Sequence, residues 1–162
     1  MTMQHPPSTT PPQVLAGVQR LVQLYENLSV DQLQQLPTCY APDAHFKDPF
    51  NAVQGIAAIT HIFAHMFATL DAPRFVVTEQ LVQGHSAFLA WDFQFAMRRW
   101  RKGQPQCIRG ATFLRLNDAG LVLEHRDYWD TAEELYEKLP VLGWLMRKLR
   151  QAGAADSAAH GG

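Results

Sequence analysis

Apolar side chains recur at intervals of three and four residues in two segments of the first 70 residues. This spacing places them on one face of a helix, so it predicts amphipathic helices over residues 11–28 and 56–70. Thr10 and Pro11 open the first segment as a cap followed by a proline at the first helical position. Gly55 precedes the second segment, which is strongly apolar.

Two shorter elements are predicted between these helices. Ser29, with Gln32 three residues later, has the spacing of a capping box and predicts a short helix that Pro37 ends. Residues 44–49 alternate as in a short strand that a proline closes, with Ala44, Phe46 and Asp48 on one face and His45 and Lys47 on the other. The alternation places Asp48 on the face opposite to the basic and imidazole side chains of this strand.

The period changes to two from Arg74 onwards. It predicts four successive strands, separated by turns rich in Gly, Asn, Asp and Pro, over residues 74–83, 87–100, 106–116 and 121–129. Helices followed by a meander of antiparallel strands predict an α+β fold. We expect a single cone-shaped domain, with a curved sheet wrapped around three helices and a cavity between sheet and helices.

The ends of the chain differ in composition from its middle. Residues 1–12 are rich in Pro, Thr and Ser and predict a disordered arm, and residues 153–162 predict a loose tail. Residues 13–140 form the predicted domain, in which residues 131–139 are the last helix. Residues 141–152 are amphipathic and basic, which fits a lid over the mouth of the cone or a packing helix better than a membrane-surface helix.

Composition and charge exclude several classes of protein. The 162 residues hold 14 basic and 15 acidic side chains, which argues against a general nucleic-acid binder. No apolar segment reaches the length of a membrane span. Cys39 and Cys107 lie far apart, which favours a reducing cytoplasm over a disulfide framework or a zinc site. His61 and His65 lie one helical turn apart without an obvious third ligand, so we expect neither metal nor cofactor.

Two stretches carry a family resemblance. The first is YAPDAHFKDP at residues 40–49, followed by Gly55, and the second is NDAGLV at residues 117–122, leading into HRDYWD at residues 125–130. With the order of elements, they resemble the SnoaL-like branch of the nuclear transport factor 2-like superfamily over about residues 13–140. The resemblance implies a small-molecule pocket, although this fold hosts isomerases, hydrolases, cyclases and plain binding modules.

Ketosteroid isomerase, a member of this superfamily, provides one comparison. Asp48 occupies the position of its general base. The two oxyanion-hole donors of the isomerase fall at Leu21 and Thr112, so neither donor is retained. Tyr25, one helical turn beyond Leu21, could reach the same space. The departures argue against isomerase chemistry of that kind.

Limonene-epoxide hydrolase provides a second comparison, because its last strand is similar. Asp127 matches the last-strand aspartate of the hydrolase, and Asp92 matches its other acid. The bridging arginine of the hydrolase falls at Ala90, which is a departure. His125 or Arg109 could take over the task of holding one proton between the two carboxylates.

Each acidic candidate has a structural alternative. Asp127 alternates with His125 and Trp129 and could line a pocket, or it could form an ion pair that steadies the fold. Asp48 could line the same pocket or cap a turn. The alternation alone points Asp92 to solvent, whereas the resemblance points it into the pocket. If Asp92 points into the pocket, the apolar side chains that alternate with it lie on the outer face of the sheet and need a partner subunit to cover them. We therefore expect a homodimer through this outer sheet face at Trp91, Phe93 and Phe95.

The sequence therefore predicts a cytoplasmic pocket protein for a small, largely apolar organic molecule. If it is an enzyme, cofactor-independent acid–base chemistry is expected, with Asp127 as the base, His125 orienting it, Asp92 as the proton donor and Asp48 in the pocket. The predicted ligand-binding residues are Tyr25, Phe63, Phe67, Thr112 and Trp129. The competing class is a non-catalytic binding or dimeric assembly module.

Overall fold

The computed structural model describes residues 9–98 and 103–130. Its helices are α1 (Pro12–Glu26), the 3₁₀ helix η1 (Val30–Thr38) and α2 (Ile56–Thr69). Its strands are β1 (Tyr40–Lys47), β2 (Ala52–Gln54), β3 (Leu70–Gln83), β4 (Ser86–Met97), β5 (Pro105–Leu116) and β6 (Val122–Trp129). Residues 1–8 of the arm predicted over residues 1–12, the predicted helices after residue 130 and the predicted tail lie outside the described residues. Pro12, at the end of the predicted arm, is the first residue of α1.

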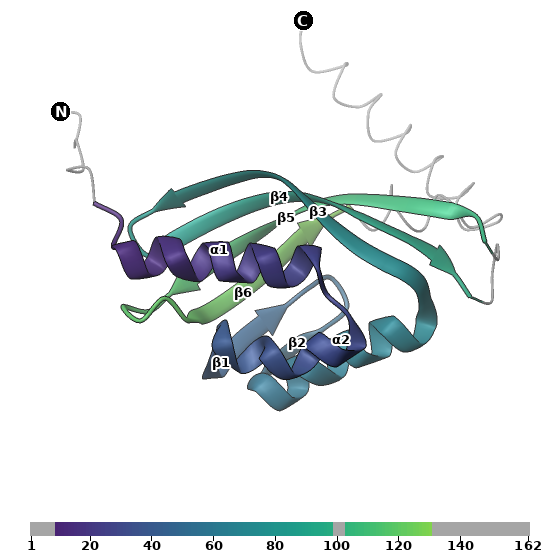
Figure 1. The fold of residues 1–162 in the computed structure, drawn as a ribbon, viewed down its shortest axis with the longest axis horizontal. Helices are drawn as coiled ribbons and strands as arrows, with labels where there is room; N and C mark the ends of the chain where they lie inside the picture. Colours follow the sequence, from purple (N-terminus) through teal and green to yellow (C-terminus); the bar gives the residue numbers. More distant parts are fainter. Residues whose placement is uncertain (1–8, 99–102, 131–162) are drawn as a thin grey trace, which may run out of the picture. The chain divides into compact units, whose positions relative to one another are not determined.

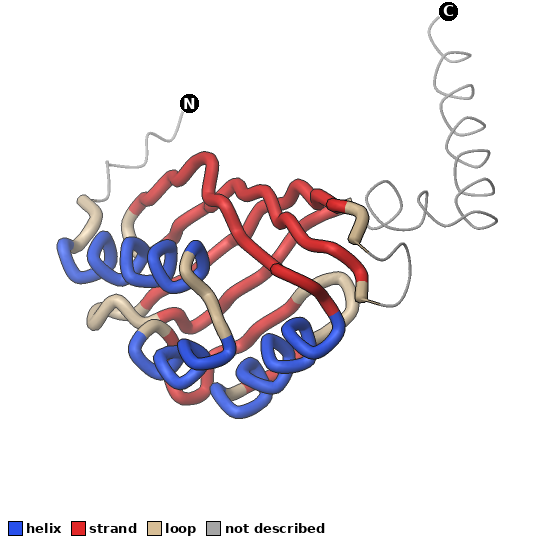
Figure 2. The backbone as a smooth tube through the Cα atoms, turned by 45° about the vertical axis from the view of Figure 1, so that its right-hand side comes forward, coloured by secondary structure: helices blue, strands red, loops and turns tan. Residues whose placement is uncertain are grey.

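The six strands form one curved, mixed sheet in the order β2-β1-β6-β5-β4-β3 (Figure 1). β1 pairs in parallel with β6, whereas the pairs β1–β2, β3–β4 and β4–β5 are antiparallel. The three helices lie on the same side of the sheet (Figures 1 and 2). The α+β fold class predicted from the sequence is thus confirmed. Within the described residues, no helix is long and apolar enough to cross a membrane.

The first helix begins without the predicted cap. Its N-cap is Pro11, Pro12 lies within its first turn, and no side chain caps it. The Thr10 hydroxyl instead accepts a hydrogen bond from the Gly84 backbone N–H at 3.0 Å. Thr10 therefore ties the start of α1 to the turn between β3 and β4, a long-range contact that local spacing does not reveal.

The second helix also differs from its prediction. It is a 3₁₀ helix, and the Ser29 side chain makes no capping hydrogen bond. Pro37 lies inside it rather than ending it, and the helix closes one residue later. There the Thr38 hydroxyl donates to the Gln35 carbonyl at 2.7 Å, and the Cys39 N–H donates to the Leu36 carbonyl at 3.0 Å.

Two strand boundaries depend on partners that are distant in the sequence. β1 starts at Tyr40, ahead of the predicted residue 44, because Tyr40 pairs with Val122 of β6 before an irregularity that ends at His45. The three-residue strand β2 was not predicted, and it exists because it pairs with the end of β1. Alternation within a segment cannot show either pairing.

The faces of β4 correct the predicted subunit interface. Trp91, Phe93 and Phe95 are buried, and Phe75 of β3 makes ring contacts with both Trp91 and Phe93. They lie on the face that the helices cover, so the prediction that they form an outer dimer surface is wrong. The alternation of side chains in β4 predicts this arrangement, whereas the family resemblance predicts the opposite one, with Asp92 facing inward.

A backbone contact fixes α1 against the turn between β5 and β6. A Cβ atom placed on Gly17 would lie 2.1 Å from the carbonyl oxygen of Gly120. Gly120 has a φ of 75°, in the left-handed region that favours glycine. The Asn117 side chain closes the turn by accepting hydrogen bonds from the N–H groups of Ala119 and Leu121. Glycine at both contact positions lets the helix lie directly on the turn.

Candidate functional site

The strand β6 brings His125 and Asp127 to the covered face of the sheet. Their side chains point the same way because they are two residues apart in a strand. His125 Nε2 and Asp127 Oδ1 are 2.8 Å apart. The His125 side chain is 3% exposed and that of Asp127 is 16% exposed. A carboxylate and an imidazole therefore meet in a nearly dry environment.

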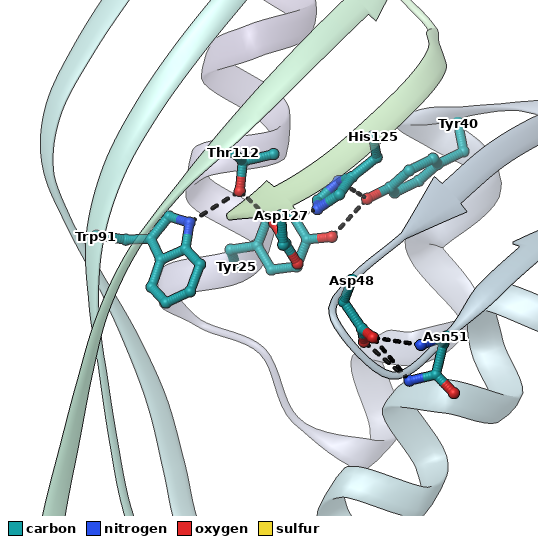
Figure 3. Close-up of polar contacts among 8 residues, drawn as sticks. All are labelled: Tyr25, Tyr40, Asp48, Asn51, Trp91, Thr112, His125 and Asp127. Carbon is teal, nitrogen blue, oxygen red and sulfur yellow. Dashed lines mark hydrogen bonds and ion pairs between the residues drawn. The ribbon is translucent and has the colours of Figure 1, made fainter. Parts of the chain in front are cut away.

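Two tyrosines extend this pair on the imidazole side. The Tyr40 hydroxyl shares a hydrogen bond with His125 Nδ1 at 2.8 Å, and the Tyr25 hydroxyl shares one with the Tyr40 hydroxyl (Figure 3). Tyr40 comes from the start of β1 and Tyr25 from α1. The ring of Phe46 stacks on the imidazole with its centre 4.6 Å away. Burial and stacking hold the imidazole in one orientation.

Two further side chains extend the pair on the carboxylate side. The Trp91 indole N–H donates to the Thr112 hydroxyl oxygen at 2.8 Å. The Thr112 hydroxyl donates to Asp127 Oδ1 at 2.5 Å. Six side chains from α1, β1, β4, β5 and β6 thus form one continuous hydrogen-bond chain, in which Asp127 accepts bonds from both directions (Figure 3).

Burial determines how the two tyrosines titrate. It raises the pKa of Tyr25 well above the ordinary value of 10.0, and the nearby Tyr40 hydroxyl and Asp127 carboxylate raise it further. Burial raises the pKa of Tyr40 in the same way, against the opposing effect of its hydrogen bond with Tyr25. Both hydroxyls therefore keep their protons at neutral pH.

We expect this burial to make the fold sensitive to alkaline pH. Above about pH 10, tyrosines of the unfolded chain lose protons while Tyr25 and Tyr40 keep theirs, so rising pH favours unfolding. Each of the two should lower the free energy of unfolding by about 1.4 kcal/mol per pH unit, up to its raised pKa. Urea denaturation between pH 9 and pH 11.5 measures this slope. Tyr25→Phe should make it shallower, and an unchanged slope would contradict the assignment.

The carboxylate faces a small cavity of about 20 Å³. This is enough for about one water molecule. The cavity is lined by Tyr25, Phe63, Phe75, Val77, Leu89, Trp91, Thr112, His125 and Asp127. Most of these side chains are apolar or aromatic, and the polar groups converge on one wall. A mostly apolar lining with a few convergent polar groups is typical of a small-molecule site, although such sites usually have volumes of about 300–1,000 Å³.

The structure brings together five of the residues that the sequence singled out. Tyr25, Phe63, Thr112, His125 and Asp127 all line the cavity. Thr112 lies at the position of a missing oxyanion-hole donor and still has a polar role, because its hydroxyl bonds to Asp127.

Phe67 and Trp129 are half-buried and are not among the residues lining this cavity.

The other two acidic candidates lie elsewhere. Asp48 Oδ1 accepts hydrogen bonds from the backbone N–H groups of Phe50 at 2.7 Å and Asn51 at 2.6 Å. Asn51 also donates its side-chain amide to Asp48, so this carboxylate closes the turn before β2. Asp92 lies on the opposite face of β4 from Trp91, across from Arg109 of β5. The expected placement of Asp92 in the pocket is wrong.

Sequence reasoning did not assign site roles to Tyr40, Phe75 and Trp91. Tyr40 lies in the stretch that carries the family resemblance, but it was predicted to lie outside the strand. Trp91 could have been found from the alternation in β4, which puts it on the same face as other buried aromatic side chains. Phe75 gave no signal beyond its place in an alternating strand.

A larger hollow of about 620 Å³ is lined by residues of β1, β2, β5 and β6, and Phe46 and His125 are among them. Its charged side chains, Lys47, Arg115, Glu124 and Arg126, are on the uncovered face of the sheet. It is broad and open, and it lacks the convergent polar groups of the inner cavity. Within the described residues, no group of His, Cys, Asp and Glu side chains is placed to hold a metal ion.

A one-sided helical layer over a curved mixed sheet, with a polar patch on its covered face, defines the class of fold to which the described residues belong. The family model of the SnoaL-like domain matches residues 18–125. The chain belongs to this family. No curated protein sequence matches the chain.

Solved structures share the fold at low sequence identity. A protein from Catenulispora acidiphila with a ketosteroid isomerase-like fold, solved in complex with trimethylamine, is 18% identical; the match covers 78% of this chain and 92% of that one, with a TM-score of 0.62. A nuclear transport factor 2-like protein of unknown function from Burkholderia pseudomallei is 15% identical, over 75% and 93%, with a TM-score of 0.65. An LEH-like epoxide hydrolase from Mycobacterium tuberculosis is 12% identical, over 76% and 87%, with a TM-score of 0.59.

Proposed function

We propose that this protein binds a small organic molecule in the inner cavity and performs cofactor-independent acid–base chemistry on it. One observation carries the proposal. Asp127 Oδ1 is held by His125 and Thr112, while the carboxylate itself lines a mostly apolar cavity. A carboxylate that is fixed in place and poorly hydrated is suited to accept a proton from a bound molecule or from water.

The proposed roles follow from the contacts. Asp127 is the base, and His125 orients it through Nε2, as expected from the sequence. Asp92 cannot be the proton donor from its place on the other face of β4, and Asp127 is the only carboxylate among the described residues that line the cavity. Tyr25 also lines the cavity, and its hydroxyl, which keeps its proton, is hydrogen-bonded to Tyr40.

Asp127→Asn tests the proposal against a panel of small ketones and epoxides. The amide keeps an oxygen that can accept the bonds from Thr112 and His125, so the fold should persist. Turnover of any substrate found should fall by about 10²–10⁴-fold, the usual contribution of a general base. Asp92→Asn removes a carboxylate from the opposite face and should leave turnover unchanged. Equal turnover in Asp127→Asn and the unaltered protein would contradict the role of Asp127.

A non-catalytic binding module is the second candidate. The lining residues favour it, because among the described residues they supply one carboxylate and no second acid for proton transfer. Either candidate requires the walls of the cavity to move, because a volume of about 20 Å³ holds about one water molecule. Binding without turnover across the panel would select this candidate. The Catenulispora protein that shares the fold was solved with a small amine bound, so amines belong in the panel. Dimerisation and a cytoplasmic location stay predictions.

A further inference from the structure

The Asp127 carboxylate has no basic side chain against it. The residues that line the cavity include no Lys or Arg, and among the described residues the recorded ion-pair partner of Asp127 is His125. A largely buried carboxylate without a cation beside it is costly. The net charge of the cavity wall, and hence the charge of the molecules that it attracts, therefore depends on whether His125 is protonated.

The carboxylate side of the hydrogen-bond chain has a fixed direction. An indole nitrogen only donates, so the Thr112 oxygen accepts from Trp91. The hydroxyl proton of Thr112 is then directed to Asp127 Oδ1. Hydrogen bonds donated to a carboxylate favour its charged form.

On the imidazole side of the hydrogen-bond chain, one arrangement of the hydrogens gives every donor an acceptor. If His125 is neutral, Nε2–H donates to Asp127, Nδ1 accepts from Tyr40, and Tyr40 accepts from Tyr25. If His125 were charged, Nδ1–H would donate to Tyr40, and Tyr40 would donate to Tyr25. The Tyr25 proton would then have no recorded acceptor in the described part of the chain. The chain of contacts thus favours a neutral imidazole, which leaves the Asp127 charge uncompensated.

The second carboxylate oxygen is available to a ligand. All recorded hydrogen bonds from described residues to Asp127 reach Oδ1. Oδ2 has no recorded partner among the described residues, and the Asp127 side chain is 16% exposed. Aromatic rings of Tyr25, Phe63, Phe75 and Trp91 line the same cavity. Aromatic faces attract cations as a carboxylate does.

We propose that the ligand of this cavity is a small organic ammonium ion, an alkylamine in its protonated form. Its N–H would donate to Asp127 Oδ2, and its alkyl groups would contact the rings. This inference rests on the proposed function, because it names the class of molecule that the same cavity takes. Entry requires the cavity to widen. Phe75 and Val77, which are half-buried, line the cavity from the edge strand β3.

Calorimetric titration of the full chain with three probes of similar size tests the proposal. Trimethylammonium chloride carries both charge and an N–H, tetramethylammonium chloride carries charge alone, and tert-butanol carries neither charge nor N–H. We expect trimethylammonium to bind at least tenfold more tightly than tert-butanol, with tetramethylammonium between them. The Trp91 indole N–H signal, assigned with Trp91→Phe, should shift during the titration and locate the binding.

Substitutions distinguish the effect of the Asp127 carboxylate on binding from a general disturbance of the fold. Asp127→Asn should weaken trimethylammonium binding at least tenfold and leave tert-butanol binding unchanged. Asp92→Asn makes the same change in net charge on the other face and should have no effect. Phe75→Leu keeps an apolar side chain but removes a ring, and should weaken the two ammonium ions more than tert-butanol. Equal affinity of trimethylammonium and tert-butanol, or equal losses in Asp127→Asn and Asp92→Asn, would overturn the proposal.

The two proposals fail in different ways. A cavity that binds ketones or epoxides but no ammonium ion would overturn the ammonium assignment and leave the proposed function intact. A Trp91 signal that no probe of any class shifts would overturn both.

Discussion

Gly17→Ala should destabilise the fold by about 3 kcal/mol, because forcing atoms into a filled space costs about this much. The new methyl group would lie 2.1 Å from the Gly120 carbonyl oxygen, which belongs to the backbone and cannot rotate away. Either α1 or the turn between β5 and β6 must shift. A shift of α1 would carry Tyr25 with it, so the variant should also disturb the hydrogen-bond chain. Urea denaturation measures the loss.

The sign of this effect separates packing from helix propensity. In an exposed helix, replacing glycine by alanine stabilises by about 1 kcal/mol. Ala16→Gly, at an exposed position of the same helix, is the matched control and should destabilise by about that amount. A stabilised Gly17→Ala variant would show that α1 does not lie directly on the turn.

Tyr40→Phe should destabilise the protein by about 2–6 kcal/mol, because it leaves two buried groups without partners at about 1–3 kcal/mol each. His125 Nδ1 loses its donor, and the Tyr25 hydroxyl loses its acceptor. Nε2–H keeps its acceptor in Asp127, so the tautomer should persist, whereas Nδ1 loses its hydrogen bond. Nitrogen-15 chemical shifts of His125 should therefore change in this variant.

Tyr25→Phe is the matched comparison. In the direction assigned to the chain, Tyr25 donates to Tyr40 and receives nothing, so its removal leaves only an oxygen lone pair of Tyr40 unfilled. The loss should be about 1 kcal/mol, the net contribution of one ordinary hydrogen bond. The His125 tautomer should be unchanged. A Tyr25→Phe variant as unstable as Tyr40→Phe would show that the hydrogens run the other way.

The sequence predicts the elements whose stability is local. Both long helices and the four strands of the meander appear within a few residues of their predicted bounds, because side-chain periodicity reports which face is buried. The start of β1, the strand β2 and the long start of β3 were missed or shortened. Each depends on a partner strand rather than on the spacing within its own segment.

Only part of the candidate site could be predicted, because some of its contacts join segments that are distant in the sequence. His125 and Asp127 could be paired from their alternation in one strand, and Tyr25 and Thr112 from the family resemblance. Asp92 was misplaced because a borrowed alignment overrode the plain alternation of β4, which points Trp91 inward and Asp92 outward. The bond between Tyr40 and His125 joins two strands that are far apart in the chain, and no local pattern could reveal it.

The parallel pairing of β1 with β6 has a consequence for how the protein forms. The two strands are separated by most of the folded chain, so their contact closes a long loop, and contacts of this kind slow folding. During synthesis, α1 and β1 leave the ribosome well before β6 does. The edge of β1 and part of the apolar face of α1 therefore stay exposed until β6 has been synthesised. Because β6 carries His125 and Asp127, the pocket should be the last part to mature, and chains truncated before residue 122 are expected to aggregate rather than fold.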